Sequence, residues 1–173
     1  MTNDDRRSVA LARLEAGKAA RNAGKNEDAA AHFRAAYDLF SALFGASPTL
    51  EDARNLGRVA FFLGEALIAL HRYEEGRRYL REAKEVWEGV VDETEALSDK
   101  RELVRAVERL GSLGRVPGDP EGRLRLMEEA RLLWREIYGE TEELSDQRDY
   151  ARSLLLLAEE EEELLEEIGR AHV

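Results

Sequence analysis

The sequence predicts an all-α fold in which antiparallel helical hairpins stack as a short solenoid of about seven helices. The first observation is a period of 47 residues, since the segment 93–101 returns almost unchanged as 140–148. Periods of about 20 to 50 residues are typical of solenoids, whose units bury their apolar faces against their neighbours. The second is the absence of period-two alternation, together with stretches rich in Ala, Leu, Glu and Arg, which favour helices.

Short connections make consecutive helices antiparallel neighbours. Gly45 and Gly139 stand where the second and sixth helices would end in a left-handed residue. In chain order, the helices are expected at residues 4–24, 26–44, 48–70, 73–91, 95–114, 120–138 and 142–168.

Start signals support four of these helices. Ser47, Thr94 and Thr141 share one repeat position, and their hydroxyls can accept a backbone N–H at the starts of the third, fifth and seventh helices. Pro48 and Pro120 fit the first turn of the third and sixth helices, where a missing N–H costs nothing.

The repeat offset also aligns chemically similar residues. The aligned sets are Phe40, Trp87 and Trp134; Asp52, Asp99 and Asp146; and Arg54, Arg101 and Arg148. An aromatic residue that recurs at one position of a packed helix is expected in the core. The aspartate and arginine of one unit are two residues apart and cannot face each other on a helix. We therefore expect these arginines to play a structural role against the preceding hairpin.

Composition restricts the class of partner. The formal net charge of −11 and the pI near 4.9 disfavour binding to nucleic acid or anionic membranes, which requires a positive surface. Protein, peptide or cationic partners are expected instead. There are no cysteines, no apolar leader and no run long enough to span a membrane, so a cytoplasmic protein is expected.

No pattern of residues indicates catalysis, a cofactor or a metal site. His32, His71 and His172 share no ligand spacing, and the sequence has neither a nucleophile motif nor a glycine-rich phosphate loop. We expect a protein that is not an enzyme.

The second unit combines Leu63-Gly64 and Leu67 with the segment 71–76, followed by Leu80 and Ala83. This spacing resembles that of the tetratricopeptide repeat family, in an extended variant, since the family's usual period is about 34 residues. The resemblance implies a single right-handed, tetratricopeptide-like domain over residues 1–173. Its units would be 26–72, 73–119 and 120–166, after an N-terminal helix at 4–24.

The resemblance further implies a non-catalytic scaffold that binds a peptide or protein segment in a concave groove. The groove residues carried over from the family pattern are Leu14, Lys18, Arg21, Asn22, Arg58, Phe61, Glu65, Ile68, Arg105, Glu108, Arg115, Arg152 and Leu155. Among them, Arg58, Arg105 and Arg152 form a ladder that could hold carboxylates by forked hydrogen bonds. Alternatively, each could pair with a carboxylate of a neighbouring repeat and order the stack.

The last helix offers a different kind of contact. At about 100° per residue, one apolar stripe, expected to pack on the preceding hairpin, comprises Leu154, Leu157, Leu164, Leu165 and Ile168. Leu156 lies outside this stripe, which indicates a homodimer or partner contact with residues 159–163 as a solvated acidic rim. The alternative to a groove scaffold is therefore a self-associating structural module, or a designed repeat protein with no evolved ligand.

Overall fold

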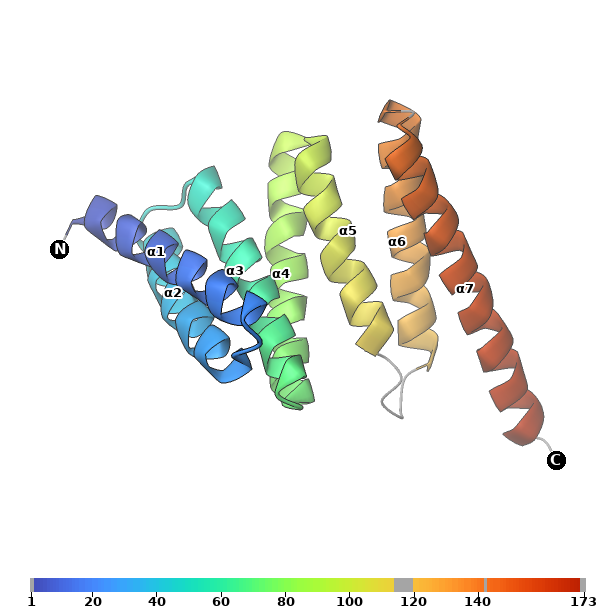
Figure 1. Ribbon diagram of the computed structural model, residues 1–173. Helices are drawn as coiled ribbons and strands as arrows, with labels where there is room; N and C mark the ends of the chain where they lie inside the picture. The colour runs from blue at the N-terminus through green and yellow to red at the C-terminus, as the bar shows by residue number, and fades with distance from the viewer. Residues whose placement is uncertain (1, 114–119, 142, 172–173) are drawn as a thin grey trace. The chain divides into compact units, whose positions relative to one another are not determined.

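The computed structural model describes residues 2–113, 120–141 and 143–171, and within these ranges it shows seven helices and no strand (Figure 1). This confirms the all-α prediction. The helices are α1 (Asn3–Asn22), α2 (Asn26–Ala46), α3 (Leu50–Ala69), α4 (Tyr73–Thr94), α5 (Leu97–Ser112), α6 (Pro120–Thr141) and α7 (Leu144–Ala171).

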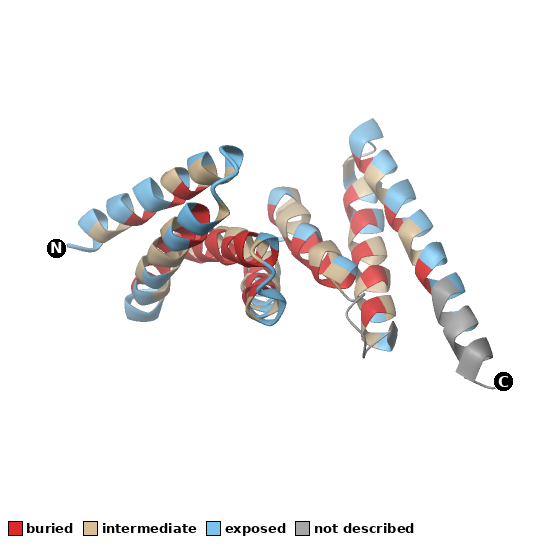
Figure 2. Cartoon of the chain, turned by 60° about the horizontal axis from the view of Figure 1, so that its bottom comes forward, coloured by how far each residue is buried: buried red, intermediate tan, exposed pale blue. Residues whose placement is uncertain are grey.

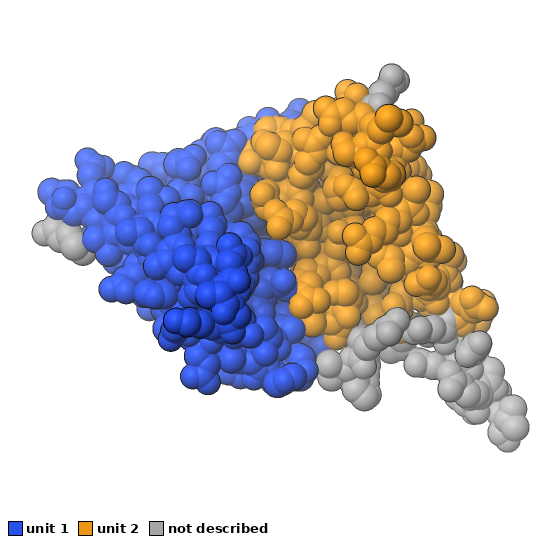
Figure 3. All heavy atoms as spheres, in the orientation of Figure 1, with its two compact units in different colours: residues 1–95 blue, residues 96–173 orange. Residues whose placement is uncertain are grey.

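The chain forms two compact units, residues 1–95 with α1 to α4 and residues 96–173 with α5 to α7 (Figure 3). In the first unit, α1 packs on α2, α2 on α3, and α3 on α4. In the second unit, α6 packs on both α5 and α7. Within each unit, consecutive helices therefore pack on one another, as expected of antiparallel hairpins.

The predicted N-caps were wrong by about half a turn. Thr49, not Ser47, caps α3, and its hydroxyl accepts the Asp52 backbone N–H at 3.1 Å. Thr2, at the same repeat position, caps α1 in a capping box with Asp5. Thr94 and Thr141 are instead the last residues of α4 and α6. The Thr94 hydroxyl donates to the Val90 carbonyl oxygen, one turn back. The Thr141 hydroxyl accepts the Glu143 backbone N–H at 3.3 Å, as predicted for a start signal, although Thr141 itself ends α6.

The predicted helix ends at Gly45 and Gly139 were also wrong, because α2 and α6 continue past both glycines. The left-handed conformation occurs instead at Glu95, which follows α4 with φ of 52°, and at Gly24 and His71. Gly24 and His71 have φ of 73° and 60° and lie between the helices of the first two hairpins. These two residues are 47 positions apart, so the hairpin loop repeats with the sequence.

The aromatic repeat position lies in the core, as predicted. Phe40 and Trp87 are fully buried and Trp134 is nearly so. Figure 2 shows the buried residues of both units as stripes along the helices, with exposed residues on the outer sides. The core of the first unit is centred on Phe33, Phe40, Leu63 and Leu67.

Two glycines allow the backbones of α3 and α4 to pack closely against each other. A Cβ atom at Gly64 would lie 2.9 Å from the Gly76 carbonyl oxygen, and one at Gly76 would lie 2.8 Å from that of Gly64. Neither position has room for a side chain, because the obstacle is backbone. The small residues of the repeat therefore allow the two helices to touch.

Candidate functional site

An ion pair between a partly exposed arginine and a buried aspartate links α1 to α3 in the first unit. The Arg7 guanidinium donates two hydrogen bonds, from Nε and Nη2, to the two Asp52 carboxylate oxygens, each at 2.8 Å. Asp52 is 0% exposed and also accepts from the Thr49 hydroxyl at 2.8 Å. This forked geometry is the strong form of a charge-assisted pair, and we call it the Arg–Asp clasp.

The second unit repeats the clasp between α5 and α7. Arg101 Nη2 donates to Asp146 Oδ2 at 2.7 Å, and the Thr141 hydroxyl donates to the same oxygen at 2.6 Å. Arginine and aspartate are 45 residues apart in both clasps. The structural role expected of Arg101 is therefore present, but its partner lies in α7, two helices further along the chain, rather than in the preceding hairpin.

The clasps also lower the pKa of their two carboxyl groups. The hydrogen bonds from Arg7 hold the pKa of Asp52 below its usual range, and those from Arg101 lower the pKa of Asp146 in the same way. A carboxyl whose pKa is depressed by folding stabilises the fold above its unfolded-state pKa. That stabilisation is lost as pH falls through the folded-state pKa.

We expect Arg7→Met to lower the melting temperature by several degrees at neutral pH, because it leaves the buried Asp52 carboxylate without its guanidinium. The difference from the wild type should shrink in acid, where protonation removes the carboxylate charge. Arg6→Met is the matched control, since the Arg6 side chain has no polar partner among the described residues. Equal melting temperatures for the two variants would show that the clasp does not stabilise the fold.

The predicted groove residues of the first unit differ in their exposure and in their contacts. Leu14 and Ile68 are buried, so their assignment to a binding surface was wrong. Lys18 and Arg21 lie over the ring of Phe62, a residue that the prediction missed, at 5.8 and 4.6 Å from its centroid.

Phe61 and Glu65 are half-buried, and Asn22 is exposed. Arg58 lies 5.9 Å from the Trp87 ring centroid, and its Nη1 donates to Asn55 Oδ1 at 3.4 Å. Three cations of this surface, Lys18, Arg21 and Arg58, thus already lie over an aromatic ring of their own unit.

The groove residues of the second unit that are described lie around one cavity of about 600 Å³, apart from Leu155, which is exposed. Arg115 falls outside the described residues. The cavity is lined by Ser98, Arg101, Glu102, Arg105, Glu108, Trp134, Asp149 and Arg152.

Charges of both signs meet around this cavity. Arg105 pairs with Glu102 at 3.0 Å, and Glu108 accepts from Trp134 Nε1 at 2.8 Å. Burial raises the pKa of Glu108, although the Trp134 hydrogen bond and the charge of Arg152 oppose that rise. The two ladder arginines of this unit therefore stand among carboxylates of the same unit. The pair of Arg105 with Glu102 lies within α5 and is not a pair with a neighbouring repeat.

Helix α7 differs from its prediction. Leu154 and Leu165 are exposed rather than packed, Leu156 and Leu157 are half-buried, and the side chains of Leu164 and Ile168 lie outside the described residues. The buried side of the helix carries polar residues instead, namely Asp146, Ser153 and Glu160. Glu160 was expected in a solvated rim but forms a buried ion pair with Arg123 of α6.

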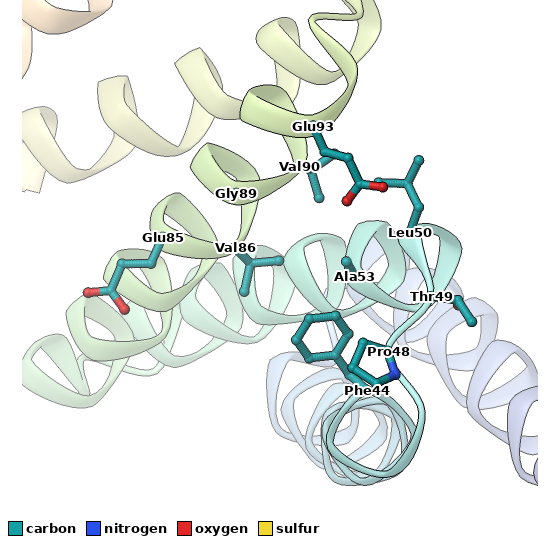
Figure 4. A pocket seen from close by; sticks show the side chains of 10 residues that line it. All are labelled: Phe44, Pro48, Thr49, Leu50, Ala53, Glu85, Val86, Gly89, Val90 and Glu93. Carbon is teal, nitrogen blue, oxygen red and sulfur yellow. The ribbon is translucent and has the colours of Figure 1, made fainter.

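A pocket that the prediction missed lies in the first unit (Figure 4). Its volume is about 430 Å³, and it is formed by the last turn of α2, the start of α3 and the second half of α4. Most of its wall is apolar, while Figure 4 shows Glu85 and Glu93 at its two ends. The lining residues are Phe44, Pro48, Thr49, Leu50, Ala53, Glu85, Val86, Gly89, Val90 and Glu93.

In the described part of the chain, no group of three or more His, Cys, Asp or Glu side chains could hold a metal ion, and no helix is both apolar and long enough to cross a membrane.

No family model matches the chain, and no curated protein matches it. Among solved structures, the chain is similar to a DHF58 filament, with 16% identity, coverage of 98% of this chain and 88% of that chain, and a TM-score of 0.49. It is also similar to the de novo designed helical repeat protein DHR64 and to a DHF119 filament. Each of these has 16% identity, coverage of 95% of this chain and 83% of that chain, and a TM-score of 0.44. Similarities this distant support no conclusion about partner or activity, and the tetratricopeptide resemblance stays a prediction.

Proposed function

We propose that this protein is a non-catalytic scaffold that binds a protein segment at the pocket of the first unit. The observation that carries the proposal is the pocket itself, a largely apolar hollow of about 430 Å³ on the surface of a packed helical unit. Ligand pockets have volumes of about 300 to 1,000 Å³ and combine apolar walls with a few polar groups. One large apolar side chain of a partner fits such a hollow.

The charges around the pocket indicate what flanks that side chain. Glu85 and Glu93 are exposed, and neither pairs with another side chain among the described residues. The chain as a whole carries a net charge of −11. A segment with basic residues on both sides of an apolar anchor therefore complements the site, since complementary charges speed encounter and fix register.

Gly89 provides a way to close the pocket without disturbing the fold. A Cβ atom at Gly89 would meet no atom within 4 Å, so a larger side chain can project there. Gly139, in α6 of the second unit, is also a helical glycine with open space around it and makes a matched control.

The test uses fluorescein-labelled short peptides with one central Phe, Leu or Ile between two Arg residues, and the same peptides with Glu flanks. We expect the Arg-flanked set to bind the wild type and Gly139→Leu equally in fluorescence anisotropy. Gly89→Leu should bind at least tenfold more weakly, which corresponds to about 1.4 kcal/mol. The proposal fails if no Arg-flanked peptide binds, or if binding survives Gly89→Leu unchanged.

Self-association is a second candidate function, and the exposed leucines of α7 favour it specifically. These leucines belong to the second unit, whereas the pocket lies in the first unit, so the two functions can be tested separately.

A further inference from the structure

Among the described residues, no helix covers the side of α7 that corresponds to the α4-facing side of α3. In α3, Gly57 and Gly64 face α4, since Cβ atoms there would collide with Trp87 and with Leu80 and Gly76 respectively. Ala60 lies between them in sequence and is fully buried. This side of the helix is therefore covered in the second hairpin.

The equivalent residues of α7, 94 positions later, are Ala151, Leu154 and Ala158, and all three are exposed. The buried residues of α7 lie on the opposite side, toward α6. Within the described part of the chain, the face of α7 that a hairpin helix would cover is open.

This open face is apolar beyond what a solvated helix needs. Leu144, Leu155 and Leu165 are 75%, 61% and 70% exposed, and Leu154 is 41% exposed. At about 100° per residue, these four leucines and the two alanines fall within an arc of about 100°. An exposed apolar band of this kind marks an interaction site more often than a free surface.

The residues of the open face are arranged symmetrically about the point between Leu154 and Leu155. Moving outward from that point in both directions, the equidistant pairs are Leu154 and Leu155, Ala151 and Ala158, Arg148 and Glu161, Gln147 and Glu162, and Leu144 and Leu165. All ten residues are exposed. Leucine thus matches leucine, alanine matches alanine, and the arginine matches a glutamate.

A two-fold axis through this central point brings the matched residues of two antiparallel helices together. Self-complementary contacts of this kind define isologous interfaces, in which the same patch is used on both subunits. The alanines allow the helix axes to approach to about 8 to 10 Å. A parallel arrangement would instead place Glu161 and Glu162 opposite their own copies, which like-charge repulsion disfavours.

We infer that the open face of α7 is a self-association surface, on which α7 of a second copy packs antiparallel about a two-fold axis between Leu154 and Leu155. The occupant is a second copy because this face complements itself in both shape and charge. The inference is independent of the pocket of the first unit, which contributes no residue to this surface.

A charge-reversal pair tests both the surface and its direction. Arg148→Glu places two carboxylates together in the dimer, and Glu161→Arg places two arginines together, so we expect each single variant to be more monomeric than the wild type in sedimentation velocity. An equimolar mixture of the two should associate again, because each helix then supplies only one sign of charge. Arg81→Glu, an exposed change of the same charge on α4, should leave the dimer intact.

Crosslinking supplies a readout that does not depend on charge. The chain has no cysteine, so cysteines can be introduced singly or in pairs. The double variant A151C/A158C should form interchain disulfides, whereas A151C alone should not, since equal positions are displaced along antiparallel helices. A wild type that stays monomeric at high micromolar concentration would overturn the inference. Efficient crosslinking of A151C alone, or a charge-reversal mixture that does not associate, would also overturn it.

Discussion

Trp87→Ala should lower the free energy of unfolding by about 3 to 5 kcal/mol, the usual cost of truncating a large aromatic side chain in a core. Trp87 is 1% exposed. Its indole lies against Gly57 so closely that a Cβ atom there would be 2.8 Å from Nε1. Gly57 has no side chain that could fill the space left by the substitution, so the space closes only if α4 shifts relative to α3. Urea denaturation followed by circular dichroism measures the loss.

Trp87→Phe is the control for this prediction, because the ring keeps most of the buried volume and should lose clearly less stability. Stability close to the wild type for Trp87→Ala would mean that the aromatic repeat position does not support the core.

Gly64→Ala should be destabilising by about 3 kcal/mol, although alanine is the better helix former by about 1 kcal/mol. The added Cβ would lie 2.8 Å from Leu80 Cγ and 2.9 Å from the Gly76 carbonyl oxygen. A leucine side chain can rotate, but the carbonyl belongs to the backbone of α4. The two helices must therefore move apart along their whole contact, which loosens the hairpin.

The matched control is Gly89→Ala, on the same pair of helices, where the added Cβ meets nothing within 4 Å. This variant should gain about 0.5 to 1 kcal/mol from helix propensity. Thermal denaturation of both variants gives the comparison. A Gly64→Ala protein that gains stability as Gly89→Ala does would contradict the close contact of α3 with α4.

The sequence allowed prediction of the number of helices, their order and the aromatic core, because these depend on periodic burial. The ends of the helices were less predictable. Thr49 and Ser47 are two residues apart, and either hydroxyl could start a helix. The prediction favoured the position that holds a hydroxyl in all three copies, but the Thr94 hydroxyl bonds back to a carbonyl oxygen of α4, and the Thr141 hydroxyl donates to Asp146.

The binding surface was less predictable still. Ile68 was assigned to a groove, yet it packs over Gly76, as the 2.7 Å approach of its Cγ1 to a Cβ at that position shows. A pattern carried over from a shorter repeat does not include that contact. The pocket was missed for a related reason, since it joins the ends of three helices whose boundaries were themselves displaced.

The orientation of α7 could not be obtained from apolar periodicity. The helix has leucines on both sides, and its covered side carries Asp146 and Glu160. Their partners are Arg101 and Arg123, which come from α5 and α6. A sequence pattern treats charged residues as exposed, so only the positions of the two arginines in space identify this side as the buried one.

The Arg–Asp clasp has a consequence for how such a chain can grow by duplication. In both clasps, the arginine of one Asp-x-Arg copy donates to the aspartate of the next copy, 45 residues further along the chain. Inserting a whole 47-residue copy within such a pair breaks one donor–acceptor link but supplies the residues for two. An insertion of any other length separates donor from acceptor and leaves a buried carboxylate without its cation. The ion pair therefore restricts the lengthening of the array to insertions of whole repeats.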